Sequence, residues 1–289
     1  MEQNVVLKMR DISKNFTGVR ALSHVDFTLR RGEIHALMGE NGAGKSTLIN
    51  VIANRIFADE GKVLVDDVPA RENMKVQEKI FCMSETDLYD KDLKIKEHFK
   101  WINRFYDSFN IDKALEISEK FNLDTDKRFK ALSKGYQSIF KLTVALSLNV
   151  PYVIFDEPVL GLDANHRELF YDLLLKDYED GERTIIIATH LIEEVANIIE
   201  EVVLIDKGKI LLQESVERLL ETGYSISGIT KEVDDYCTDK NVIGYDELGS
   251  LKIAYVLGEK TPLPENSNLQ ISAMNLQKLF VKLTEKGGN

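Results

Sequence analysis

Short, mainly apolar runs recur along the chain and predict the centre of the fold. Such runs are typical of strands that are buried on both faces of a parallel sheet. Glycine, proline or charged residues bound each run, as expected where a strand gives way to a turn or a helix. The runs are Glu33–Met38, Ile80–Met83, Tyr152–Phe155 and Thr184–Thr189.

Alternation of apolar and polar residues predicts a second, antiparallel sheet near the N-terminus. Between Ala21 and Leu29, Val25 and Phe27 keep a period of two, whereas Leu22 is out of step. The other segments of this region are a first strand at Val5–Met9, a loop at Asp11–Thr17 that carries Phe16, and a strand pair within Gly61–Val68 around an Asp66–Asp67 turn.

Apolar residues then change to a helical period, which predicts a helical insertion over about residues 87–150. We interpret its first apolar stripe as core, although Trp101 fits the stripe imperfectly. A second helix is expected at Asp112–Phe121 with Asn110 or Asp112 as its cap, and a third from Leu132–Gln137 to Asn149. The stripe consists of Ile95, Phe99, Ile102, Phe105, Tyr106 and Phe109.

Downstream, Asp163 is expected to cap a helix at Ala164–Lys176, and a hairpin is expected around Asp206–Gly208. From about residue 222 the pattern becomes short apolar runs punctuated by glycine and proline, with a last helix at Met274–Thr284. We therefore divide the chain into residues 1–221 and a small α+β appendage at 222–289, for which a packing or dimer-contact role is the default interpretation.

Composition excludes several classes of protein. The net charge of −11 argues against nucleic-acid binding, which requires a basic surface. Cys82 and Cys237 lie far apart, fit no metal or redox spacing, and suit a reducing cytosol. The uncharged run Leu142–Phe155 is shorter than the ~20 residues that span a bilayer. We expect a soluble chain whose membrane role, if any, depends on a partner.

The segment Gly39–Thr47 carries the strongest chemical signal, because it fits the phosphate-loop pattern G-x-x-x-x-G-K-[ST] between a strand and a helix. Glycines let the backbone wrap a polyphosphate, and N–H groups at the helix start face the anion. A glycine-rich turn without a ligand is the alternative, which the Lys-Ser-Thr ending disfavours. The expected nucleotide-binding residues are Gly39, Asn41, Gly42, Ala43, Gly44, Lys45, Ser46 and Thr47.

Two carboxylates, Asp156 and Glu157, follow the buried strand Tyr152–Phe155. Ligands of open parallel sheets bind at the carboxyl ends of strands. Asp156 is therefore expected to hold Mg²⁺ together with Ser46, and Glu157 to act as general base on the attacking water. An acidic pair also occurs as a plain helix entry, but the upstream phosphate loop favours the catalytic interpretation.

Residues 4 to about 220 resemble the nucleotide-binding subunit of an ATP-binding cassette (ABC) transporter. The resemblance rests on the order of the phosphate loop, Leu132–Gln137, Tyr152–Glu157, Gly161–Asp163 and His190. It implies an α/β fold with a mixed sheet core, an antiparallel β subdomain and a helical insertion, here followed by the appendage. It also implies ATP and Mg²⁺ as cofactors.

The resemblance further implies a role for each matching position. Phe16 would stack on adenine, and His190 would touch the γ-phosphate. Ser133 and Gly135, which flank Lys134, would contact the γ-phosphate bound by the other subunit, and Asp163 would lie in the loop that crosses the dimer interface. Glu85 would join the metal site.

Two regions depart from the family pattern. In Leu132–Gln137, the signature segment of the family, Lys134 replaces a glycine and Tyr136 replaces a glutamine. Outside that segment, Glu85 replaces a glutamine. A carboxylate at residue 85 would bind Mg²⁺ more strongly than an amide. We hypothesise that Lys134 offsets this charge across the dimer interface; the equal alternative is that Lys134 points to solvent and Glu85 merely takes the place of glutamine.

The function implied is the ATPase subunit of a bacterial ABC exporter, similar to those for antimicrobial peptides or phenol-soluble modulins. ATP would close a head-to-tail homodimer or heterodimer, and hydrolysis would reset it. A transmembrane permease would hold this cytoplasmic chain at the inner face of the membrane. The alternative is an ATP-dependent dimerising regulatory module with little hydrolysis. Chromosome-type relatives are disfavoured because Lys45 and Ser133 lie too close in sequence for a coiled coil between them.

Overall fold

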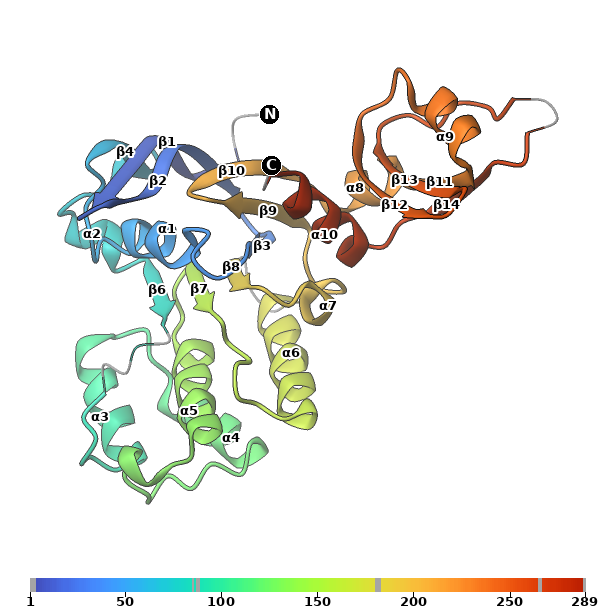
Figure 1. Cartoon of the computed structure of the whole chain (residues 1–289). Coiled ribbons are helices and arrows are strands. Elements are labelled where there is room, and N and C mark those ends of the chain that lie inside the picture. The colour runs from blue at the N-terminus through green and yellow to red at the C-terminus, as the bar shows by residue number, and fades with distance from the viewer. Residues whose placement is uncertain (1–3, 85, 87–88, 180–182, 265–266, 288–289) are drawn as a thin grey trace.

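The computed structural model describes residues 4–84, 86, 89–179, 183–264 and 267–287. Their strands form three sheets (Figure 1). Among these residues, no helix has the length and apolar character needed to cross a bilayer.

The central sheet has six strands in the order β10-β9-β3-β8-β7-β6. Its parallel strands β3, β7 and β8 are buried at every position, which confirms the prediction that these segments are buried strands. A hairpin closes one edge, where β10 runs antiparallel to β9. The bounds are β3 Ile34–Met38, β6 Ile80–Met83, β7 Tyr152–Asp156, β8 Thr184–Thr189, β9 Glu201–Asp206 and β10 Lys209–Ser215.

The antiparallel sheet has the order β2-β1-β4-β5 and corrects one prediction. The segment expected to be a loop at Asp11–Thr17 continues β1 as far as Phe16, which pairs with Val19. Register shifts along β1 break the period of two, with Asp11 at a positive φ of 53°. The same shifts explain why Leu22 is buried although it looked out of step. The bounds are β1 Val5–Phe16, β2 Val19–Arg30, β4 Glu60–Val65 and β5 Val68–Pro69.

Helices cover the central sheet and form a separate helical layer below it (Figure 1). Asn110 caps α4, where its Oδ1 accepts from the Lys113 N–H at 2.9 Å, as predicted. The interpretation of the first stripe as core is wrong for Phe105, which is 75% exposed, and for Tyr106, which is 37% exposed. Trp101, which fitted the stripe imperfectly, is 47% exposed. Phe105 and Trp101 lie on α3, whose buried face carries Phe99 instead. The bounds are α1 Lys45–Ile52, α2 Met74–Gln77, α3 Ile95–Phe105, α4 Ile111–Lys120, a 3-10 turn Phe129–Ala131, α5 Lys134–Ser147, α6 Ala164–Glu179, α7 Ile192–Val195 and α8 Val216–Thr222.

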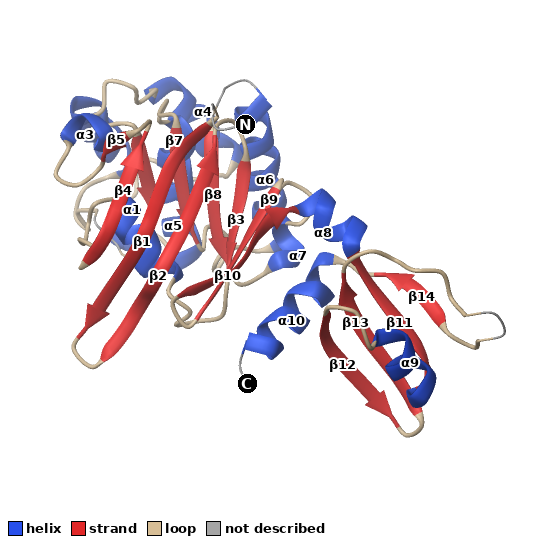
Figure 2. Ribbon diagram, turned by 90° about the horizontal axis from the view of Figure 1, so that it is seen from above, coloured by secondary structure: helices blue, strands red, loops and turns tan. Residues whose placement is uncertain are grey.

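The C-terminal segment forms a third sheet in the order β12-β13-β11-β14, with α9 packed on one face. This sheet projects from the rest of the chain in both views (Figures 1 and 2). The last helix, α10, returns and packs against α7 and β9. Its Leu276 and Leu279 belong to the same buried cluster as Ile34 of the central sheet. The bounds are β11 Gly223–Ile229, α9 Thr230–Cys237, β12 Val242–Leu248, β13 Leu251–Leu257, β14 Gln270–Ala273 and α10 Leu276–Gly287.

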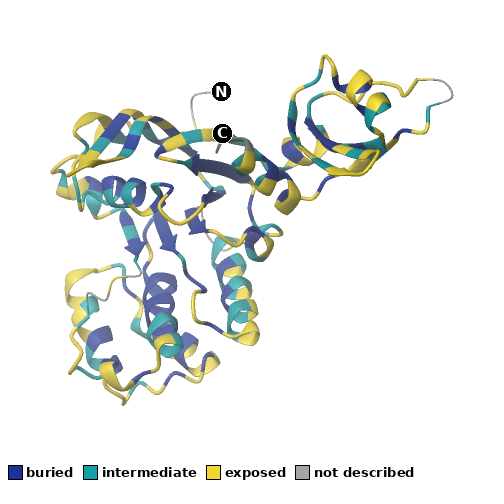
Figure 3. Cartoon of the chain, in the orientation of Figure 1, coloured by how far each residue is buried: buried dark blue, intermediate teal, exposed yellow. Residues whose placement is uncertain are grey.

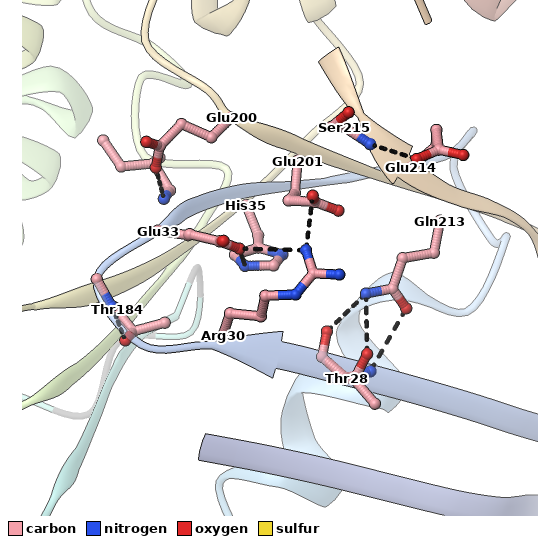
Figure 4. Close-up of polar contacts among 12 residues, drawn as sticks. Thr28, Arg30, Glu33, His35, Thr184, Glu200, Glu201, Gln213, Glu214 and Ser215 are labelled. Atoms are coloured by element: carbon pink, nitrogen blue, oxygen red, sulfur yellow. Dashed lines mark hydrogen bonds and ion pairs between the residues drawn. The ribbon is translucent and has the colours of Figure 1, made fainter. Parts of the chain in front are cut away.

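A polar cluster joins β2, β3 and β9 near the start of β3 (Figure 4). His35 is 1% exposed, and its Nε2 lies 3.1 Å from Glu33 Oε2. Arg30 Nη1 donates to Glu201 Oε1 at 2.9 Å. Contact with His35 lowers the pKa of Glu33, whereas burial raises the pKa of Glu201. The ion pair between Arg30 and Glu201 therefore compensates a desolvated carboxylate.

Candidate active site

Three neighbouring parallel strands bring the predicted catalytic segments to one edge of the central sheet. The strand β3 leads into the phosphate loop, β7 ends at Asp156, and β8 ends one residue before His190. Their register aligns Met38 with Thr189 and Asp156 with Ala188. Because parallel strands present their carboxyl ends on the same side, residues far apart in sequence meet here.

Two glycines of the phosphate loop have no room for a side chain. A Cβ on Gly39 would lie 2.4 Å from the Ile205 carbonyl oxygen. Gly44 has a φ of +112°, and a Cβ there would lie 2.9 Å from the Ala21 carbonyl oxygen. The loop is also fastened to the β9–β10 hairpin, since the Gly208 N–H donates to the Ala43 carbonyl at 2.8 Å. The glycine pattern therefore serves both the loop conformation and its close packing.

Lys45 is buried and folds back over the loop. Its Nζ donates to the Gly39 carbonyl at 2.6 Å and to the Glu40 carbonyl at 3.2 Å, and it lies 3.9 Å from Glu157 Oε1. Burial lowers the pKa of Lys45, while Glu157 and Asp156 oppose that shift. The site thus holds a partly desolvated cation where a phosphate would bind.

The first turn of α1 supplies the remaining groups of the loop. Ser46 and Asn41 are exposed, and Thr47 is half-buried, so the Ser46 hydroxyl is accessible to a ligand. Asp156 is buried at the end of β7. Within the part of the chain that the structure describes, no group of three or more His, Cys, Asp or Glu residues forms a metal site. The oxygens of Ser46 and Asp156 suit Mg²⁺ if phosphate oxygens and water complete its shell.

Glu157 and His190 form a direct pair. His190 Nδ1 lies 3.0 Å from both Glu157 Oε1 and Oε2. Glu157 has a positive φ of 49°, and its N–H donates to the Ala188 carbonyl at 2.9 Å, which holds this unusual backbone in place. Such a conformation in a non-glycine residue is uncommon and concentrates at functional sites. The structure therefore brings together the two residues that the sequence assigned to catalysis.

The signature residues lie elsewhere, at the start of α5. Ser133 is its N-cap, with Oγ accepting from the Tyr136 N–H at 3.3 Å, and both Ser133 and Lys134 are exposed. A Cβ on Gly135 would lie 2.9 Å from the Gly161 carbonyl oxygen, which explains the glycine. This segment packs against the loop before α6 and leaves the Ser133 and Lys134 side chains facing outward.

Two other predicted residues, Phe16 and Asp163, lie at the periphery. Phe16 is 48% exposed at the end of β1, and Lys14 Nζ lies 5.6 Å from its ring centre. Asp163 accepts from the His166 N–H at 3.0 Å, which confirms it as the cap of α6, and it is exposed. Glu85 lies outside the described residues.

Sequence reasoning missed Arg167, which connects two functional segments. Its Nε donates to the Leu162 carbonyl at 2.9 Å, and its guanidinium pairs with Glu194 on α7, shortly after His190. It thereby couples the loop at Gly161–Asp163 to the segment that carries His190. No sequence pattern marks this pair, because its members lie on separate helices.

Comparison with known proteins identifies the domain. Residues 22–160 match the family model described as ABC transporter. The chain contains an ABC-type ATPase domain. The matched range includes the phosphate loop, the signature segment and the acidic pair, in the order that the resemblance required.

Curated relatives support an ATP-binding subunit of a transporter. The ABC transporter ATP-binding protein YtrB of Bacillus subtilis (strain 168) is 26% identical, with 84% of each chain covered. The ribose import ATP-binding protein RbsA 2 of Rhizobium meliloti (strain 1021) is 28% identical over 83% of this chain. The chain spans 49% of that import protein, about half its length.

A solved structure shows the same fold. The dimeric post-hydrolysis state of an ATP-binding cassette bound to ADP and Pi has a TM-score of 0.66 and 24% identity. The match covers 73% of this chain and 98% of that one. The mixed sheet with its helices is therefore the fold of an ABC ATPase nucleotide-binding domain.

Proposed function

We propose that the chain is the ATPase subunit of an ABC exporter, in which ATP binding closes a head-to-tail dimer and hydrolysis resets it. The observation that carries this proposal is the convergence of Lys45, Glu157 and His190 at one sheet edge. A module that only bound nucleotide would not need a carboxylate paired with a histidine beside the phosphate lysine.

In this mechanism Lys45 and the loop N–H groups hold the β- and γ-phosphates. Ser46 and Asp156 would hold Mg²⁺, which supplies positive charge to the phosphate oxygens. The Glu157 carboxylate accepts a proton from the water that attacks the γ-phosphorus, while the bond to the ADP oxygen breaks. His190 orients Glu157 by donating from Nδ1 across the 3.0 Å contact, and its ring would lie against the γ-phosphate.

A second subunit would complete the site. Ser133 and Lys134 are exposed at the start of α5, which suits contact with a partner's γ-phosphate. Exposed Asp163 suits the crossing loop, and exposed Phe16 suits stacking on adenine. We propose that Lys134 offsets the charge of Glu85 in this closed dimer. The dimer is formed by two copies of this chain or with a second ATP-binding subunit.

The transport partner would be a transmembrane permease that holds the chain at the inner face of the cell membrane. A groove of about 440 Å³ opens between β6 and α3, where Phe81, Tyr89, Ile102 and Tyr106 contribute to its lining. We propose that this groove, with the helical insertion, receives the permease. Cysteines introduced in the groove should crosslink to a co-expressed permease; crosslinks confined to the C-terminal sheet would contradict this placement.

The steady-state rate of ATP hydrolysis by the complete transporter separates the proposed function from a regulatory module. An exporter subunit should turn over continuously, and transported cargo should change its rate. A regulatory module should bind ATP and dimerise with almost no release of phosphate. The export direction is tested in the same preparation by cargo accumulation inside inverted vesicles, because uptake into right-side-out vesicles would indicate import.

A further inference from the structure

His166 lies in the first turn of α6 and holds both oxygens of Asp163. Its ring Nδ1 lies 2.9 Å from Asp163 Oδ2, and its backbone N–H donates to Asp163 Oδ1 at 3.0 Å. Because an ionised carboxylate can only accept hydrogen bonds, Nδ1 carries the proton of this contact. The bonds from the backbone N–H and from the ring lower the pKa of Asp163 and keep it ionised. A carboxylate whose side chain is 65% exposed is thus fixed by one neighbour.

The ring of His166 is itself held by two other helices. Its centre lies 5.9 Å from the ring centre of Tyr136 in α5, edge to face, and 5.9 Å from that of Phe121 at the end of α4. Phe121 is fully buried, so this side of the contact belongs to the core. Only 22% of the His166 side chain is exposed. Packing of this kind restricts rotation of the ring and keeps its Nδ1 directed at Asp163.

Tyr136 connects the same ring to the signature segment. It is the residue that replaces a glutamine there, and a glutamine could not supply this ring contact. Its backbone N–H donates to Ser133 Oγ at 3.3 Å. A second link joins the two helices, since Ser138 Oγ donates to the Leu160 carbonyl at 3.4 Å. The first turns of α5 and α6, which lie side by side (Figure 1), therefore carry Ser133 and Asp163 as one packed unit.

We propose that His166 is a positioning residue, which holds Asp163 and the start of α5 in the arrangement that a second subunit meets in the closed dimer. The inference rests on the proposed function, which places Ser133 and Asp163 between subunits. Figure 3 shows α5 buried along most of its length, whereas the chain that leads into α6 is largely exposed. Groups that are fixed before association lose less conformational entropy on binding. His166 thus acts through Asp163.

The kinetics of ATP hydrolysis by the complete transporter test this role. His166→Phe keeps a ring between Tyr136 and Phe121 but removes the Nδ1 donor. It should lower kcat by about 3- to 5-fold, the size expected for an exposed charged contact. The affinity of the full-length chain for ATP and its unfolding midpoint should not change. Wild-type kcat in this variant, or a loss matched by weaker ATP binding or lower stability, would overturn the proposal.

A double-mutant cycle tests whether His166 acts through Asp163. Asp163→Ser keeps an oxygen that can cap α6 but removes the second oxygen, which the His166 ring holds. The double variant His166→Phe with Asp163→Ser should therefore lose no more kcat than the weaker of the two single variants. Losses that multiply would mean that the two residues act independently, which would overturn the proposal.

Tyr136 offers a matched pair of variants. Tyr136→Gln should lower kcat as His166→Phe does, whereas Tyr136→Phe, which keeps the ring, should retain the wild-type value. Equal kcat for these two variants would overturn the proposal, and the pair decides the question if His166→Phe fails to fold. A wild type that hydrolyses no ATP would contradict the proposed function itself, whereas an active wild type with unaffected variants would overturn only the role of His166.

Discussion

At the scale of single residues, the site depends on a lysine that the fold holds in a partly desolvated position. Lys45 is buried, yet its Nζ is kept near Glu157 and two loop carbonyls. These carbonyls are neutral acceptors, so a polyphosphate offers the lysine stronger, charge-assisted hydrogen bonds. The arrangement is therefore prepared for an anion before one binds.

We predict that Lys45→Ala lowers ATP affinity by about 30-fold, because hydrogen bonds to charged groups contribute about 2 kcal/mol. Isothermal titration calorimetry with Mg²⁺ and ATP measures the change. Lys260→Ala is the matched control, since Lys260 is exposed and lies in the C-terminal segment. Equal affinities for wild type and Lys45→Ala would show that the loop does not bind ATP through this lysine.

A second residue-scale prediction concerns the ion pair at the start of β3. Arg30→Met should lower the free energy of unfolding by about 1–2 kcal/mol at neutral pH, because Glu201 would remain charged in a desolvated position. Arg10→Met is the matched control, since Arg10 faces Asp26 across 3.9 Å with both side chains exposed.

The pH dependence of this loss has a definite sign. Burial already raises the pKa of Glu201, and losing Arg30 should raise it further. A carboxyl whose folded pKa exceeds its unfolded pKa binds more protons in the folded state, so the loss should shrink as pH falls toward the ordinary glutamate range. Denaturant unfolding at several pH values measures it, and a loss that grows on acidification would contradict the account.

At the scale of elements, most strands and helices follow from local pattern. The mainly apolar runs at β3, β7 and β8 leave little alternative to buried parallel strands. The continuation of β1 to Phe16 escaped prediction because its register shifts erase the period of two. The exposure of Phe105 was missed because helical spacing places it in the apolar stripe, and only the packing of α3 decides which side faces out.

The last helix gives the element-scale prediction. Leu279 is 3% exposed and joins the cluster of the central sheet, so α10 is part of the main core although it follows the projecting sheet in sequence. Leu279→Ala should cost about 2–4 kcal/mol of unfolding free energy. Val281→Ala, at a side chain 39% exposed on the same helix, should cost far less. If the ATP-binding part unfolds at an unchanged midpoint in Leu279→Ala, α10 does not stabilise it.

At the scale of the whole molecule, the residues assigned to the site form two separate groups, one at the sheet edge and one in the outward-facing signature segment. Lys45, Glu157 and His190 lie together in one chain, whereas Ser133 and Lys134 face away at the start of α5. In the proposed mechanism, a second subunit that presents its own signature segment would close the site. In this account ATP binding and hydrolysis are separate events, and Glu157 acts in hydrolysis alone.

The Glu157→Gln variant tests that separation most directly. Its amide keeps the size of the side chain but cannot accept the proton from water, so phosphate release should fall by about 10²–10⁴-fold. ATP binding should persist, and with ATP and Mg²⁺ the variant should elute from gel filtration as a stable dimer. Hydrolysis by Glu157→Gln at the wild-type rate, with no ATP-dependent dimer, would contradict the account.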